Sequence, residues 1–98
     1  MEYKDIKISA NFRPKKKKVI LEKELEDGMV LYDPESEKIY SLNNTAAYIW
    51  TLCDGKKTFH KIIDFIRKDF DEFEDAPEKL VASTLEHFLK EGLIENNK

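Results

Sequence analysis

The chain has 98 residues, of which 41% are hydrophobic and 38% are charged, and its formal net charge is −3. These values fit one domain with a modest core, and three glycines and three prolines exclude a low-complexity or linker-rich protein. The sequence holds no apolar run of about 18 residues that could cross a membrane, no signal-peptide core, and one cysteine, too few for a disulfide framework. We therefore expect a cytoplasmic protein with no membrane partner.

The positive charge is concentrated at the N-terminus. Residues 1–18 carry seven Lys or Arg against Glu2 and Asp5, a surplus of five, so that residues 19–98 sum to −8. Arg13-Pro14 and the four lysines of residues 15–18 interrupt any strand pattern, and such a charge run is usually a solvated tail. We expect a basic flexible arm at residues 1–18 and a domain at residues 19–95, with binding of the arm to an acidic partner as the alternative.

Three short β-prone runs follow the arm, with ordered structure expected to begin near Val19. Residues 19–21 and 29–32 are β-prone apolar runs, residues 39–42 are the third predicted strand, and turn signals at residues 26–28 and 33–37 separate them. Strands joined by such short connections pair antiparallel. The pattern predicts a three-stranded antiparallel meander.

The apolar spacing then changes to that of helices. Asn43 or Asn44 can cap a first helix that reaches about Cys53, and Asp54-Gly55 ends it. Thr58 can cap a second helix, and the acidic residues 71–75 predict a loop after it. The apolar positions of the second helix recur at helical spacing: Phe59, Ile62, Ile63, Ile66 and Phe70.

A third helix is expected from Pro77, which suits a first turn, to Gly92. Leu93 and Ile94 can pack back on the core. Its apolar stripe is wide and comprises Leu80, Val81, Leu85, Phe88 and Leu89. The fold predicted is α+β and winged-helix-like, with a three-stranded antiparallel sheet followed by three helices.

No group of residues suggests catalysis. Cys53 lies among apolar residues, where nothing would stabilise a thiolate, so we interpret it as a small buried hydrophobe. His60 and His87 lie on different helices without the spacing of metal ligands, and the acidic residues 69–75 lack the glycine of a calcium loop. We expect no enzyme, no catalytic residue, no metal site and no cofactor.

Two functions suit a winged-helix-like shape. DNA binding would use the third helix, but residues 78–91 have net charge −1 and no Arg, Asn or Gln to contact bases, which argues against nucleic acid. A DNA-binding transcriptional regulator remains the alternative function, and the feature that supports it is the run of lysines at residues 15–18. The other function is capture of an extended peptide by an open edge strand at residues 38–42 beside the third helix. Leu80, Thr84 and Phe88 could face such a groove, or all three could belong to the core.

The segment 38–55, KIYSLNNTAAYIWTLCDG, resembles the PqqD family, also called the RiPP recognition element. Its most specific part is LNNTAAYIW, followed by DG and a threonine that opens the second helix. The similarity extends from about Val19 to Ile94 and includes the helix end FLKEGLI. The family often has an acidic residue early in the third helix, where Ser83 or Thr84 stands here, so a leader preference is not carried over.

The resemblance implies a domain that binds the leader segment of a ribosomally synthesised precursor peptide as an added strand between the third strand and the third helix. It implies presentation of this leader to a modifying enzyme (a radical SAM protein, a cyclodehydratase or a protease) with no chemistry in the domain itself. Leu42, Trp50 and Gly55 would carry the resemblance for reasons of fold, while the backbone of Ile39 and Ser41 would pair with the peptide. The peptide-binding residues so predicted are Lys38, Ile39, Tyr40, Ser41, Leu42, Leu80, Thr84, His87 and Phe88.

Overall fold

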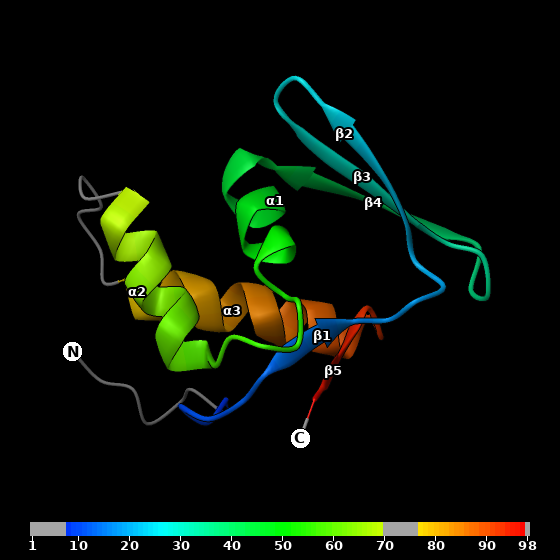
Figure 1. Cartoon of the computed structure of the whole chain (residues 1–98). Helices are drawn as coiled ribbons and strands as arrows, with labels where there is room; N and C mark the ends of the chain where they lie inside the picture. Colours follow the sequence, from blue (N-terminus) through cyan, green and yellow to red (C-terminus); the bar gives the residue numbers. More distant parts are fainter. Residues whose placement is uncertain (1–7, 70–76, 98) are drawn as a thin grey trace.

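The structure is a computed structural model that describes residues 8–69 and 77–97. Three strands form one antiparallel sheet in the order β2-β3-β4, and β1 pairs with β5 separately. Figure 1 shows α1 between this sheet and α3, with α2 beside α3. The predicted α+β fold, a three-stranded antiparallel sheet followed by three helices, is confirmed. The elements are β1 (Pro14–Lys16), β2 (Leu21–Leu25), β3 (Gly28–Asp33), β4 (Lys38–Asn43), α1 (Asn44–Thr51), α2 (Phe59–Asp69), α3 (Pro77–Lys90) and β5 (Ile94–Asn96).

The three-stranded sheet has one buried face and one exposed face. Met29 and Leu31 of β3 are 3% and 0% exposed, and they alternate with Tyr32, whose side chain lies on the opposite face and is 36% exposed. The turn between β3 and β4 is held by Asp33, whose carboxylate accepts hydrogen bonds from the Glu35 N–H and the Ser36 hydroxyl, both at 3.0 Å. This turn fixes the register in which β4 becomes the edge of the sheet.

The helix ends follow the capping residues. The Asn43 side chain accepts the Ala46 N–H at 2.8 Å, so Asn43 rather than Asn44 caps α1. Thr58 accepts the Lys61 N–H at 3.1 Å and caps α2. Gly92, with φ of 75°, follows α3 in the left-handed conformation that glycine adopts without strain. The predicted starts of α2 and α3 and the end of α3 before Gly92 are therefore confirmed, while α1 ends at Thr51 rather than near Cys53. Phe70 and residues 71–75 lie outside the described residues.

The Asp54-Gly55 pair has a structural role. Asp54 accepts the Lys56 N–H at 2.8 Å and forms an ion pair with Lys57 at 2.5 Å. Gly55 has φ of 79°, and a Cβ there would lie 3.2 Å from the side chain of Lys15. The pair therefore shapes the connection from α1 to α2 and lets β1 pass close by.

The first strand of the sheet lies further along the chain than predicted. Residues 19–21 were expected as the strand, but β2 spans Leu21–Leu25 and all five of its residues are exposed. Ile20 is instead buried just before the strand, and its N–H bonds to the Lys17 carbonyl at 3.2 Å in a turn. An exposed edge strand has no buried face to impose an apolar alternation, so the pattern LEKEL gave no strand signal.

The expectation of a flexible arm is wrong for residues 8–18. Pro14–Lys16 forms β1, which pairs antiparallel with β5. Ile8 and Phe12 belong to the buried core, and the Phe12 carbonyl accepts the Phe59 N–H at 2.7 Å. The reason is that the partner strand lies about 80 residues away in sequence, where local pattern has no reach. Lysine side chains can remain at the surface while their backbone pairs.

The core is built around two aromatic side chains. Trp50 of α1 and Phe88 of α3 are 0% and 1% exposed, and their rings meet edge to face with centroids 5.3 Å apart. Leu93 and Ile94, predicted to pack back on the core, are 0% and 2% exposed. Within the described residues, no helix is long and apolar enough to cross a membrane.

Candidate functional site

The open edge of β4 offers backbone groups to a further strand. A Cβ placed on Gly28 would overlap the carbonyl oxygen of Leu42, so this carbonyl points toward β3. The Asp33 carbonyl also points into the β3–β4 hairpin, where it accepts the Glu37 N–H at 2.7 Å. Backbone groups alternate in direction along an antiparallel strand, so those of Ile39 and Ser41 point away from β3, toward the open side.

One face of α3 is only partly covered. Leu80, Thr84, His87 and Glu91 follow each other at steps of four, three and four residues, which places them on one side of the helix. Glu91 comes directly after the last residue of α3 and continues this side, because its N–H bonds to the His87 carbonyl at 3.0 Å. Leu80, Thr84 and Glu91 are half-buried and His87 is exposed. The Thr84 hydroxyl donates to the Leu80 carbonyl at 2.9 Å, so it faces its own helix and leaves its methyl group free to pack.

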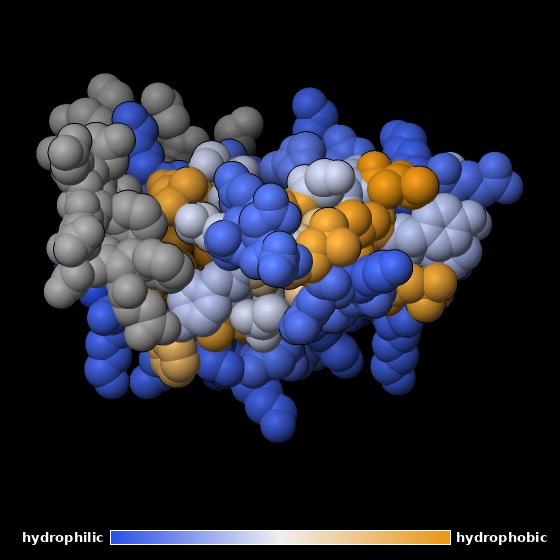
Figure 2. All heavy atoms as spheres, turned by 90° about the horizontal axis from the view of Figure 1, so that it is seen from above, coloured by the Kyte–Doolittle hydropathy of each residue, from blue (hydrophilic) through white to orange (hydrophobic). Residues whose placement is uncertain are grey.

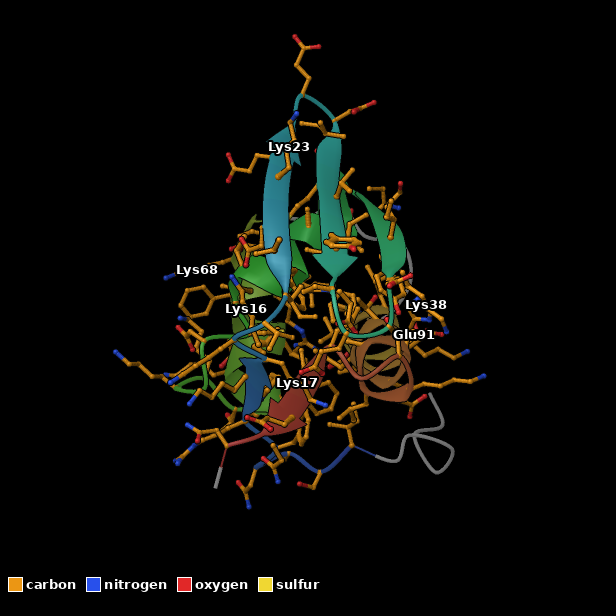
Figure 3. All side chains as sticks on the ribbon, turned by 90° about the vertical axis from the view of Figure 1, so that its right-hand side faces the viewer. Lys16, Lys17, Lys23, Lys38, Lys68 and Glu91 are labelled. Carbon is orange, nitrogen blue, oxygen red and sulfur yellow. The ribbon has the colours of Figure 1, made fainter. Side chains whose placement is uncertain are left out.

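Glu91 joins this helix face to the edge strand. Its Oε1 accepts the Tyr40 hydroxyl at 3.3 Å and lies 3.9 Å from the Lys38 ammonium. Figure 3 shows Lys38 and Glu91 close to each other, between the start of β4 and the end of α3. We call β4 together with the α3 face of Leu80, Thr84, His87 and Glu91 the β4–α3 site. Sequence reasoning missed Glu91, although its helical spacing from Thr84 and His87 could have indicated it.

The Tyr40 hydroxyl reports on this junction. Partial burial raises the pKa of Tyr40 above 10.0, and the negative charge of Glu91 and the hydrogen bond to it raise the pKa further. Because the shift is upward, it stabilises the folded state below pH 10, and this contribution is lost as the pH rises through the folded-state pKa of Tyr40.

Replacing Glu91 with glutamine should lower the pKa of Tyr40 but not return it fully to the ordinary value, because burial remains. The measurement is an NMR pH titration of protein with labelled tyrosine rings. Glu95→Gln, an exposed carboxylate on β5, serves as the control and should leave the Tyr40 titration unchanged. An identical Tyr40 titration in Glu91→Gln and the unmodified protein would contradict the junction.

The predicted peptide-binding residues divide into three groups, of which one is half-buried and comprises Tyr40, Leu80 and Thr84. Ile39, 69% exposed, lies at the surface together with Lys38, Ser41 and His87. Leu42 and Phe88 are 9% and 1% exposed, so their side chains belong to the core. Any contribution of these two to the site is therefore to hold β4 and α3 in place from behind.

The cysteine and the two histidines considered for catalysis or metal binding lie on different parts of the fold: Cys53 follows α1, His60 is on α2 and His87 is on α3. Cys53 is fully buried, and this burial raises the pKa of its thiol to about 12. Its Sγ donates to the Ile49 carbonyl at 3.3 Å, which fits the predicted role as a small core residue. His60 lies on α2 with a 73% exposed side chain, 3.8 Å from Asp64. Among residues 8–69 and 77–97, no three His, Cys, Asp or Glu side chains are grouped as metal ligands would be.

The lysines of the basic segment make contacts within the domain. Lys16 forms an ion pair with Glu22 at 3.0 Å, and Glu22 also accepts the Trp50 indole N–H at 2.9 Å. Lys15 lies opposite Glu95 in the β1–β5 pair. Lys15 and Lys16 thus lie beside acidic residues of the same domain, and this arrangement does not favour the DNA-binding alternative.

Comparison with known proteins agrees with this architecture. The sequence profile of the family described as coenzyme PQQ synthesis protein D (PqqD) matches residues 28–94. No curated protein sequence matches the chain. A solved structure described as TbiB1 in complex with the TbiA(beta) leader peptide has a TM-score of 0.73 at 20% identity, over 83% of this chain and 94% of that one. A lasso peptide synthetase B1 complexed with the leader peptide has a TM-score of 0.70 at 24% identity, over 85% of this chain and 98% of that one. At these identities the two structures share the fold, whereas the profile covers most of the sequence, and the chain therefore belongs to the PqqD family.

Proposed function

We propose that this domain binds the leader segment of a ribosomally synthesised precursor peptide as an added strand on β4 and presents it to a modifying enzyme. The observation that carries the proposal is the open edge of β4, where the backbone groups of Ile39 and Ser41 point away from the sheet. Family membership supports it, as do the two similar structures, both of which are complexes with leader peptides.

The affinity of such a complex would come from two sources. A hydrogen bond between backbones contributes a net ~0.5–1.5 kcal/mol, so the four groups of Ile39 and Ser41 supply a few kcal/mol and little sequence preference. Side chains of the peptide that point toward α3 would meet Leu80 and the methyl group of Thr84. These contacts add apolar burial, at about 25 cal/mol per Å², and they depend on the peptide sequence.

The domain would act as an adaptor without chemistry of its own. The raised pKa of Cys53 and its burial leave it un-ionised and out of reach of a substrate. The enzyme that acts on the peptide would be a separate protein: a radical SAM protein, a cyclodehydratase or a protease. A short precursor gene and a gene for such an enzyme beside this one would be the expected genomic setting.

Ser41→Pro tests the proposed pairing. Proline removes the outward N–H of Ser41, and it is tolerated in an edge strand when that N–H does not serve the sheet. We expect peptide affinity to fall by about tenfold or more, because one hydrogen bond is lost and the peptide carbonyl that it served is left unpaired. The probe is a labelled peptide selected from a displayed random library by the unmodified domain, and affinity is read from fluorescence anisotropy.

The matched control is Glu24→Pro in β2, the opposite edge of the same sheet. By the same alternation, its N–H points to solvent, so thermal stability should change similarly in both variants while only Ser41→Pro loses affinity. When the peptide is added to labelled domain, the NMR chemical-shift changes of the domain should concentrate at residues 38–42 and on the α3 face of the site. Equal binding by the two variants, shifts confined to other regions, or failure to enrich any peptide would overturn the proposal.

A further inference from the structure

The exposed face of the sheet carries a row of apolar side chains that ends at the open edge. Leu21, Tyr32 and Ile39 lie directly opposite one another across β2, β3 and β4. They are 57%, 36% and 69% exposed, with Ile39 the most exposed large hydrophobic side chain among the described residues. In Figure 2, seen from above, hydrophobic atoms reach the surface on the right of the picture, on the side where the sheet lies in Figure 1.

The neighbouring rows of this face end differently. In one row, Lys23 and Val30 lie beside Ser41 at the β4 edge. In the other, Leu25 and Gly28 lie beside Asn43. Of the three side chains that β4 presents on this face, only Ile39 is apolar. An exposed isoleucine at an open sheet edge is a liability in solution, because it favours unwanted pairing.

A strand added to β4 would extend each row by one residue. Side chains directly opposite in neighbouring strands lie about 4.5–5.5 Å apart at Cβ and interact, most favourably when both are β-branched or aromatic. The residue opposite Ile39 would therefore cover it and lengthen the apolar row. The residue opposite Ser41, two positions away in the peptide, would meet a hydroxyl and gain nothing from being apolar.

We propose that the Ile39 side chain contacts the leader on the solvent-facing side of the added strand. This contact selects a β-branched or aromatic residue at the single leader position opposite Ile39. This proposal rests on strand addition at β4, and it adds a second recognition surface to the one that faces α3. The leader would thus be recognised on both of its faces, with an apolar requirement at one outward position and polar residues accepted two positions away.

Ile39→Thr tests this role because threonine keeps a β-branched shape and strand propensity while it removes apolar surface. The matched control is Leu21→Thr, which changes the far end of the same row on β2, separated from the edge by Tyr32. A displayed random peptide library is selected in parallel against the unmodified domain and both variants. The position opposite Ile39 is identified by NMR contacts between labelled domain and one selected peptide.

We expect the unmodified domain and Leu21→Thr to enrich Ile, Val, Tyr or Phe at that position, and Ile39→Thr to lose this enrichment. The affinity of the selected peptide should fall by up to about fivefold in Ile39→Thr, the upper end of the range for one cross-strand pair. The same enrichment in all three proteins would overturn the role of Ile39 while leaving strand addition intact. Peptide contacts away from β4, or no enrichment by any of them, would instead refute strand addition itself.

Discussion

Replacing Phe88 with alanine is expected to lower the free energy of unfolding by about 3–5 kcal/mol, the usual cost of removing a buried aromatic side chain. Phe88 is 1% exposed and packs edge to face on Trp50, so the substitution leaves a cavity between α1 and α3. Peptide binding would be lost only indirectly, as β4 and α3 lose their support. The measurement is equilibrium unfolding in urea, followed by tryptophan fluorescence.

The neighbouring Leu89 provides the control. It is 38% exposed, and Leu89→Ala should change stability by well under the cost at Phe88, since exposed substitutions usually fall within about 0.5 kcal/mol. If Phe88→Ala does not fold, Phe88→Leu retains most of the volume and should still fold while it loses the ring contact. Wild-type stability in Phe88→Ala together with lost peptide affinity would show that Phe88 contacts the peptide directly.

Replacing Gly28 with alanine is expected to cost about 3 kcal/mol or more, through backbone strain and overpacking together. Gly28 has φ of 156°, and an added Cβ would overlap the Leu42 carbonyl oxygen of β4. The Cβ would be fixed to the backbone of β3 and the carbonyl belongs to the backbone of β4, so the overlap can be relieved only by shifting the β3–β4 pairing. A shift of this pairing would also displace the open edge of β4, and the affinity for a selected peptide should therefore fall as well.

Gly92→Ala separates strain from collision. Gly92 also has positive φ, 75°, but a Cβ there would meet only the Lys17 ammonium at 3.9 Å. This substitution should cost about 1–2 kcal/mol, the penalty of the left-handed conformation alone. Thermal unfolding of both variants measures the difference. Equal losses at Gly28 and Gly92 would contradict a specific contact between Gly28 and β4.

Local chemistry accounts for most of the elements that the sequence predicted correctly. A cap such as Asn43 or Thr58 bonds to an N–H three residues away, and Gly92 ends a helix through its own dihedral angle. The turn of Asp33 is likewise closed by its own neighbours. Because these interactions span only a few residues, they can be read from the order of amino acids.

The structure separates the residues predicted for the candidate site by their exposure, which the sequence could not do. The edge strand and the partly exposed side of α3 were expected, but helical spacing alone could not separate Phe88, which is 1% exposed, from Thr84. That separation depends on where Trp50 lies in space. Glu91 was missed because its partners, Tyr40 and Lys38, lie on another element about 50 residues away.

The sequence by itself determined the helix caps to within one residue, the helical periodicities, the second and third strands of the sheet and the family motif of residues 42–55, because each of these depends on neighbours along the chain. Only the tertiary structure decided that β1 pairs with β5, that Phe88 is core and that Glu91 meets Tyr40. It also decided that Leu21, Tyr32 and Ile39 form one row ending at the open edge. The physical reason is that strand register and burial arise from contacts between distant segments, which no local pattern specifies.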